Sequence, residues 1–225
     1  MMPPRPRLVT FDFYTALVDY QATIAPLLSR VLGDAADAAL APQWRAKQLE
    51  WAQLSNSLGR DRIPFRECTR LALVHVLARR HIALRERDID ALVAAWDRLA
   101  PWPEAPATLA AIKARGYAIA ILSNGDEAML RSGAAAFDVA FDAVLASDYA
   151  GHYKPHPSMY ALPTTRLGVP ARDVLHVAGS GNDVLGAKRA GLRCAWSNRS
   201  GEPPADPAVR ADDEFADLSA LLALL

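Results

Sequence analysis

The sequence predicts an α/β fold in which a doubly wound parallel sheet is interrupted, after its first strand, by a helical insertion. Three observations support this prediction. A short run of β-branched and aromatic residues at 8–13 carries an acidic residue, Asp12, near its end. A long stretch with helical periodicity follows over about 20–99. From residue 101 onward, strand-length apolar runs alternate with helical segments, as a parallel sheet requires.

The helical insertion is expected to begin soon after the first strand. Apolar residues recur at helical spacing in three stretches, near 44–54, 71–77 and 89–96, and no strand is expected among them. A cluster of prolines at positions 101, 103 and 106 closes the insertion. The sequence thus predicts a core domain from residues 6–16 plus 101–225, and a helical cap domain from residues 17–100.

Four further strands are expected after the insertion, at 117–125, 141–148, 174–179 and 193–197. Helices are expected near 104–115, 126–136, 157–167 and 183–190, and three of them end at a glycine, as helices often do: Gly116, Gly168 and Gly191. Parallel sheets bind ligands beyond the carboxyl ends of their strands. The residues predicted at those ends are Asp12, Ser123, Asn124, Asp148 and Ser180.

The composition excludes several classes of function. Lys plus Arg balance Asp plus Glu at 25 each, so no global charge favours nucleic acid or an anionic membrane. The two cysteines, Cys68 and Cys194, have no CxxC spacing, which fits a reducing compartment without disulfides or structural zinc. No run approaches the roughly twenty apolar residues of a membrane span, and no apolar signal segment is evident. A cytoplasmic protein without a membrane or nucleic-acid partner is expected.

Four segments, in order, resemble the motifs of the haloacid dehalogenase superfamily: FDFYTALVD (11–19), ILSNGD (121–126), YKPHPSMY (153–160) and AGSGNDVLGAKRAG (178–191). The segment WRAKQLEW (44–51) is similar to the arginine-bearing cap helix of the 2-haloacid dehalogenases. The resemblance covers nearly the whole chain. It implies a superfamily core with a helical cap, and a hydrolase that removes halide from a small anionic substrate, a short 2-haloalkanoic acid, without a cofactor. It also implies that the chain can form a homodimer.

The resemblance implies roles for four catalytic residues. Asp12 is the nucleophile that forms an ester with the substrate, and Lys154 keeps its carboxylate ionised and oriented. Asp183 pairs with Lys154 and positions or activates the hydrolytic water. Arg45 closes over the site and holds the departing halide or the substrate carboxylate. The structural alternatives are a turn-capping aspartate, an exposed lysine, a helix N-cap at Asn182 or Asp183, and an exposed arginine paired with glutamate.

Further residues are expected to bind the substrate, because they carry hydroxyl, amide or aromatic groups inside these motifs. They are Tyr14, Thr15, Ser123, Asn124, Tyr160, Ser180 and Asn182.

Two positions separate the dehalogenase reading from its main alternative, a magnesium-dependent phosphatase. Phosphatases of the superfamily carry an acid two residues after the nucleophile, which protonates an alkoxide, whereas halide needs no proton and this chain has Tyr14. They also carry a carboxylate four residues before Asp183, where this chain has Gly179, so too few carboxylates remain for a hard cation. No metal is expected.

The match to the family also departs at several positions. Thr15 and Ala16 replace the usual Gly and Thr of the first motif, Ser180 replaces an asparagine, and Ala46 replaces a polar residue after the cap arginine. These departures keep a third reading open, a catalytically weak member of the superfamily that binds a metabolite or a protein.

Overall fold

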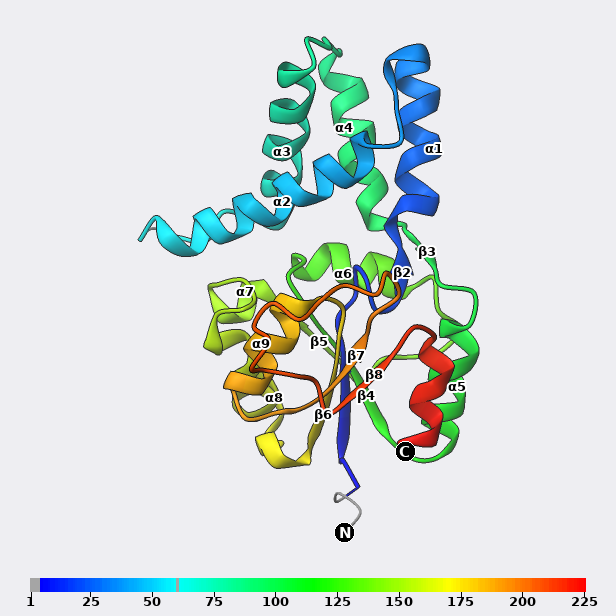
Figure 1. Cartoon of the computed structure of the whole chain (residues 1–225), viewed down its shortest axis with the longest axis vertical. Helices are drawn as coiled ribbons and strands as arrows, with labels where there is room; N and C mark the ends of the chain where they lie inside the picture. Colours follow the sequence, from blue (N-terminus) through cyan, green and yellow to red (C-terminus); the bar gives the residue numbers. More distant parts are fainter. Residues whose placement is uncertain (1–4, 60) are drawn as a thin grey trace.

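A computed structural model describes residues 5–59 and 61–225 of the protein. Its larger part is a six-stranded parallel sheet with the order β5-β4-β1-β6-β7-β8 (Figure 1). Its strands are β1 (Leu8–Phe11), β4 (Ala118–Ser123), β5 (Ala143–Ala146), β6 (Val174–Ala178), β7 (Arg193–Ser197) and β8 (Asp213–Phe215). The chain fills the sheet on one side of β1 before it crosses to the other. The carboxyl ends around β1 therefore form the crevice in which such sheets bind ligands.

Helices cover both faces of the sheet, so its central strands β1 and β6 are fully buried, whereas the edge strand β8 is partly exposed. Helices α8 and α9 pack on each other and on β5 to β7, while α5 and the final 3-10 helix pack together on the other face (Figure 1). The helices of this part are α5 (Ala105–Ala114), α6 (Glu127–Ala134), α7 (Ser147–Ala150), α8 (Pro157–Leu167), α9 (Gly181–Arg189), η3 (Ala171–Asp173) and η4 (Leu218–Ala223). The α/β class predicted from the sequence is confirmed.

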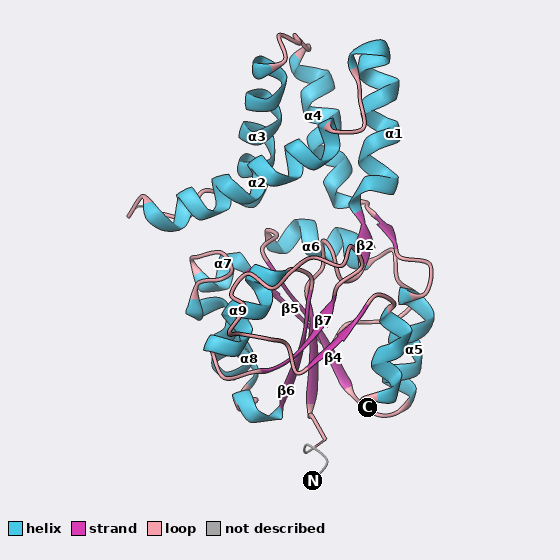
Figure 2. Cartoon of the chain, in the orientation of Figure 1, coloured by secondary structure: helices cyan, strands magenta, loops and turns pink. Residues whose placement is uncertain are grey.

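Four α-helices stand over the carboxyl ends of the strands and form the cap (Figure 2). They are α1 (Tyr20–Leu32), α2 (Leu40–Ser57), α3 (Phe65–Arg79) and α4 (Glu86–Ala94), with the 3-10 helices η1 (Gly33–Ala35) and η2 (Ala95–Asp97) between or after them. None of the helices formed by the described residues is both long and apolar enough to cross a membrane.

A short two-stranded ribbon joins the cap to the sheet. β2 (Val18–Asp19) pairs antiparallel with β3 (Ala100–Pro101), so both chain crossings run side by side. Within the described residues of 20–99 no strand occurs, and β2 and β3 lie at the two boundaries of this segment, where no strand was predicted. A strand of two residues has no measurable periodicity, and its partner lies at the far end of the insertion. β8 was not predicted for a similar reason, because a strand of three residues is too short to show an alternation of apolar and polar side chains.

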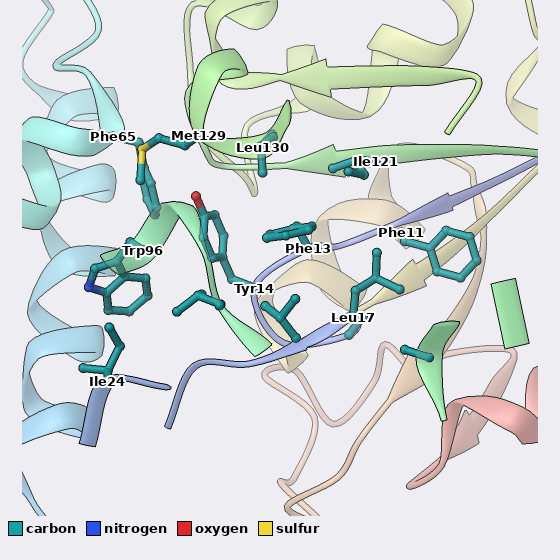
Figure 3. Close-up of a cluster of buried hydrophobic side chains, with 14 of the residues drawn as sticks. Phe11, Phe13, Tyr14, Leu17, Ile24, Phe65, Trp96, Ile121, Met129 and Leu130 are labelled. Carbon is teal, nitrogen blue, oxygen red and sulfur yellow. The ribbon is translucent and has the colours of Figure 1, made fainter. Parts of the chain in front are cut away.

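The cap is also fastened to the core by apolar and polar contacts. Tyr14 packs its ring against Phe13 of the core and against Phe65 and Trp96 of the cap, at ring-centroid distances of 5.4, 5.2 and 6.1 Å (Figure 3). Asp126, just before α6, accepts hydrogen bonds from the backbone N–H groups of Phe65 and Arg66. A core carboxylate thus caps the first turn of α3, whose own N-cap residue is a proline.

The expected elements are present with shifted ends. The run at 141–148 is a strand only to Ala146, and Ser147 begins the short helix α7. Gly116, Gly168 and Gly191 have positive φ angles of 82°, 67° and 79°, as expected for residues that end helices.

Candidate active site

Asp12 lies directly after β1, in the crevice at the centre of the sheet, and four donors hold its carboxylate. Its Oδ1 accepts hydrogen bonds from Ser123 Oγ at 3.0 Å and from Lys154 Nζ at 3.5 Å. Its Oδ2 accepts from the backbone N–H and the hydroxyl of Thr15, at 3.2 and 3.0 Å. Only 8% of Asp12 is exposed. Both oxygens are therefore fixed in direction, and the carboxylate borders a confined space.

Lys154 lies in the loop before α8 and is buried between two carboxylates. Its Nζ lies 2.9 Å from Asp183 Oδ2 and 3.5 Å from Asp12 Oδ1. The Asn124 side chain accepts the Lys154 backbone N–H at 2.7 Å, and Gln53 of the cap donates to the Lys154 carbonyl at 2.8 Å. Lys154 is thus positioned from the core and from the cap, and its ammonium neutralises part of the negative charge in the crevice.

Asp183 is in the first turn of α9, and every group that contacts its carboxylate is a donor. Lys154, Tyr160 and His176 donate to it over 2.9, 2.9 and 3.1 Å. Burial alone would raise the pKa of Asp183, but Lys154 and His176 outweigh that effect and hold the pKa well below its usual value. The N-cap of α9 is Ser180, whose hydroxyl accepts the Asp183 N–H, so neither Asn182 nor Asp183 caps this helix.

Arg45 reaches the crevice from α2 of the cap. Its guanidinium lies over the rings of Tyr14 and Trp96, 5.1 and 5.7 Å from their centres, and it donates to Gln48 Oε1 at 2.6 Å. Gln48 in turn donates to Thr69 of α3. The side chain is buried and pairs with no glutamate among the residues that the structure describes, so Arg45 is not an exposed helix arginine. The cap therefore holds the Arg45 guanidinium in a defined orientation at the cavity wall.

A cavity of about 490 Å³ separates the cap from the strand ends. The residues proposed for the site that line it are Asp12, Tyr14, Thr15, Arg45, Asn124, Lys154, Ser180, Asn182 and Asp183. Ser123 and Tyr160 stand behind this wall, where their hydroxyls hold Asp12 and Asp183. Asp148 was predicted at a strand end, but it lies in α7, two residues beyond β5, where it binds Arg62 and the N–H of Glu127 and does not line the cavity.

Tyr14 presents its ring, and not its hydroxyl, to the site. Its hydroxyl is buried and has no hydrogen-bond partner among the described residues. Burial raises the pKa of Tyr14 far above its usual value, so the phenol stays neutral. A buried hydroxyl whose pKa is raised this far does not supply the acid that a phosphatase carries at this position.

Gly179 passes so close to Asp12 that no side chain fits there. A Cβ atom at this position would lie 2.3 Å from Thr15 Oγ1 and 2.5 Å from Asp12 Oδ2. No group of three or more His, Cys, Asp or Glu residues suited to a metal ion occurs within the part of the chain that the structure describes. The donor set here, two carboxylates bridged by an ammonium, does not fit a magnesium ion.

His176, which was not predicted as a site residue, contacts both Asp183 and Lys154 from β6. In the sequence, His176 could be noticed only as a polar residue within an apolar strand; its pairing with Thr10 of β1 is visible only in the structure. Gln48, Gln53 and Asn56 of α2 were also missed. Asn56 exchanges two hydrogen bonds with the backbone of Tyr153, beside Lys154, and a polar helix face gives no indication of such a contact.

The sequence-family model of the haloacid dehalogenase-like hydrolases matches residues 6–191, and the chain belongs to this family of hydrolases. It is 33% identical to (S)-2-haloacid dehalogenase 4A of Burkholderia cepacia, over 97% of this chain and 94% of that protein. It is 36% identical to the (S)-2-haloacid dehalogenase of Xanthobacter autotrophicus, over 84% of this chain and 74% of that one.

Solved structures agree with this assignment. The L-2-haloacid dehalogenase from Xanthobacter autotrophicus superposes with a TM-score of 0.89 at 31% identity, covering 97% of this chain and 98% of that one. The same enzyme with chloropropionic acid covalently bound superposes with a TM-score of 0.87 at 30% identity, with the same coverage.

Proposed function

We propose that this protein is a hydrolytic dehalogenase of short 2-haloalkanoic acids, with residues 6–16 and 101–225 as its core domain and 17–100 as its cap domain. One observation carries the proposal: a carboxylate held by four donors, Asp12, and a buried cation, Arg45, line the same cavity between the cap and the sheet. A nucleophile opposite a halide-stabilising cation is what a displacement at carbon requires. The names of the relatives support the same reaction.

In the first step, an oxygen of Asp12 attacks C2 of the substrate and halide leaves with the electron pair of the carbon–halogen bond. An ester between Asp12 and the substrate results. Arg45 holds the departing halide or the substrate carboxylate, while Lys154, Ser123 and Thr15 hold Asp12 in the attacking orientation. Asn124, Ser180 and Asn182 are proposed to bind the substrate carboxylate and to exclude other orientations.

In the second step, water attacks the carbonyl carbon of the ester and restores Asp12. One proton of that water ends on the hydroxyl of the 2-hydroxy acid, and the other is released. We assign Asp183 and Lys154 to this step. Because its pKa is held low, Asp183 works as an oriented charge that positions the water and Lys154 rather than as a strong base.

The proposal includes no cofactor. Its cytoplasmic location rests on two free, buried cysteines, Cys68 and Cys194, which suit a reducing compartment. A homodimer is proposed from the family resemblance alone.

A panel of substrates tests the proposal. Halide release would be measured with chloroacetate and 2-chloropropionate, and phosphate release with p-nitrophenyl phosphate, each with and without magnesium. We expect halide release alone, and its loss in Asp12→Asn. Phosphatase activity that needs magnesium would establish the alternative enzyme, and no turnover by a folded protein would establish the binding protein. Asp148→Asn, a change in α7 outside the cavity, serves as the control that should retain activity.

A further inference from the structure

A second layer of polar residues lies beneath the cavity, around His176. This histidine is in the middle of β6 with 0% exposure, and it does not line the cavity. Its Nε2 lies 3.1 Å from both carboxylate oxygens of Asp183 and 3.3 Å from Lys154 Nζ. Its Nδ1 lies 2.9 Å from the hydroxyl of Thr10, the residue paired with it across β1 and β6. The imidazole therefore links the centre of the sheet to the catalytic residues.

The neighbours of the ring determine where its proton resides. Asp183 is ionised and can only accept, so Nε2 must carry a hydrogen and donate it. The Lys154 ammonium has no lone pair, so it and Nε2 are two donors that share one carboxylate. Nδ1 then has a free lone pair, which accepts the hydroxyl hydrogen of Thr10.

The ring stays neutral in this environment. Burial lowers the pKa of His176, and the nearby Lys154 ammonium lowers it further, while the Asp183 carboxylate opposes them. The remaining titratable groups around the ring are Tyr160 on α8, Cys194 on β7 and, more distantly, Asp12. Both Tyr160 and Cys194 have raised pKa values because they are buried, so neither adds a charge.

We propose that Thr10 and His176 form a positioning pair, in which a neutral imidazole with its proton on Nε2 shares Asp183 with Lys154 and so sets the ammonium between Asp183 and Asp12. This inference rests on the proposed function of the site. Lys154 Nζ is already closer to Asp183 than to Asp12, at 2.9 against 3.5 Å. Without the imidazole donor, Asp183 draws the ammonium further from Asp12.

The kinetic consequence is a fall in kcat with little change in KM, because the pair lies outside the cavity. Losing a hydrogen bond to a charged group typically costs about tenfold or more in rate. We expect His176→Leu to lose about tenfold or more in kcat. His176→Gln, which can place an amide N–H near the Nε2 position, should stay within about threefold of the wild type. Cys194→Ala, an equally buried change opposite His176 on β7, is the control with normal kcat.

Thr10 should act only through the histidine. Thr10→Val should lower kcat by about threefold in the wild type and should have no further effect in the His176→Leu background, since energies of coupled residues are not additive. Additive effects of the two changes, or equal kcat values for His176→Leu and His176→Gln, would overturn the proposal.

The protonation of the ring can be measured without any substrate. In ¹⁵N-labelled protein at neutral pH, the histidine signal that disappears in His176→Gln should report a protonated Nε2 and an unprotonated Nδ1. A proton on Nδ1, or on both nitrogens, would refute the proposed arrangement. A wild-type protein that releases no halide would refute the proposed function instead, because the ring measurement does not depend on turnover.

Discussion

Thr15 is joined to Asp12 twice, since its backbone N–H and its hydroxyl both donate to Oδ2 of the carboxylate, over 3.2 and 3.0 Å. The family motif has its threonine one position later, where this chain has the buried Ala16. The hydroxyl nevertheless reaches the nucleophile. The departure in the first motif therefore leaves Asp12 with its threonine hydrogen bond, so this departure gives no reason to expect a catalytically weak protein.

Replacing Thr15 tests this contact. Thr15→Val keeps the shape of the side chain and removes the hydroxyl, so we expect kcat to fall ten- to hundredfold, the range for a lost hydrogen bond to a charged group. Thr15→Ser should remain near the wild type because it keeps the donor. Steady-state halide release measures both. Equal activity of the valine variant and the wild type would show that the hydroxyl does not orient Asp12.

Arg45→Ala should lower kcat/KM for a 2-haloacid about ten- to hundredfold, because a buried cation that contacts substrate or halide is removed. Arg45→Lys should recover only part of this loss, since an ammonium lacks the planar group that lies over Tyr14 and Trp96. Arg79→Ala, an exposed arginine on α3, is the matched control and should be silent. An unchanged kcat/KM in Arg45→Ala would show that this cap residue does not take part in the reaction.

Halide release should not depend on a metal ion. Gly179 and Tyr14 stand where the superfamily's phosphatases carry carboxylates, and Lys154 already bridges the two that remain in these motifs, Asp12 and Asp183. We expect equal rates with EDTA and with added magnesium. Loss of activity in EDTA and its recovery with magnesium would instead favour the phosphatase alternative.

Isotope labelling tests the covalent step. If Asp12 attacks carbon, the hydroxyl oxygen of the first product comes from its carboxylate, and the oxygen of water enters Asp12 during ester hydrolysis. A single turnover in H₂¹⁸O should therefore label the peptide that carries Asp12 and leave the 2-hydroxy acid unlabelled. Mass spectrometry of the Asp12 peptide and of the 2-hydroxy acid shows which of the two carries the label. Label in the hydroxy acid would mean direct attack by water.

Stability should fall in mild acid because of His176. Its pKa is lower in the folded protein than in the unfolded chain, so the unfolded chain binds more protons below about pH 6.5. The stabilising contribution is complete above that pH and is lost as pH falls toward the folded pKa, by at most about 1.4 kcal/mol per pH unit for one proton. Asp183 has a lowered pKa as well, but its contribution is lost only in stronger acid, below about pH 4.

Urea unfolding at pH 7.5 and 5.5 measures this effect. The free energy of unfolding should fall more in the wild type than in His176→Gln, which has no titrating group at this position, while the other histidines are common to both proteins. An identical pH dependence in the two proteins would show that the pKa of His176 is not lowered in the folded state.

The sequence by itself determined the strand that precedes Asp12, the helical insertion and the order of strands and helices after it. Each depends on local patterns: a buried strand is an apolar run, an amphipathic helix repeats about every 3.6 residues, and a glycine ends a helix. The same patterns placed Asp12 and Ser123 at strand ends. They could not show that Asp148, also predicted at a strand end, lies in α7 and turns toward Arg62.

The tertiary structure alone decided the contacts that organise the site. Thr15 rather than residue 16 reaches Asp12 because the loop after β1 sets the direction of each side chain. His176 meets Asp183 and Thr10 because the register of β1 and β6 places Thr10 opposite His176. Such distances depend on strand register and on side-chain direction between segments far apart in the chain, which no local pattern in a single sequence encodes.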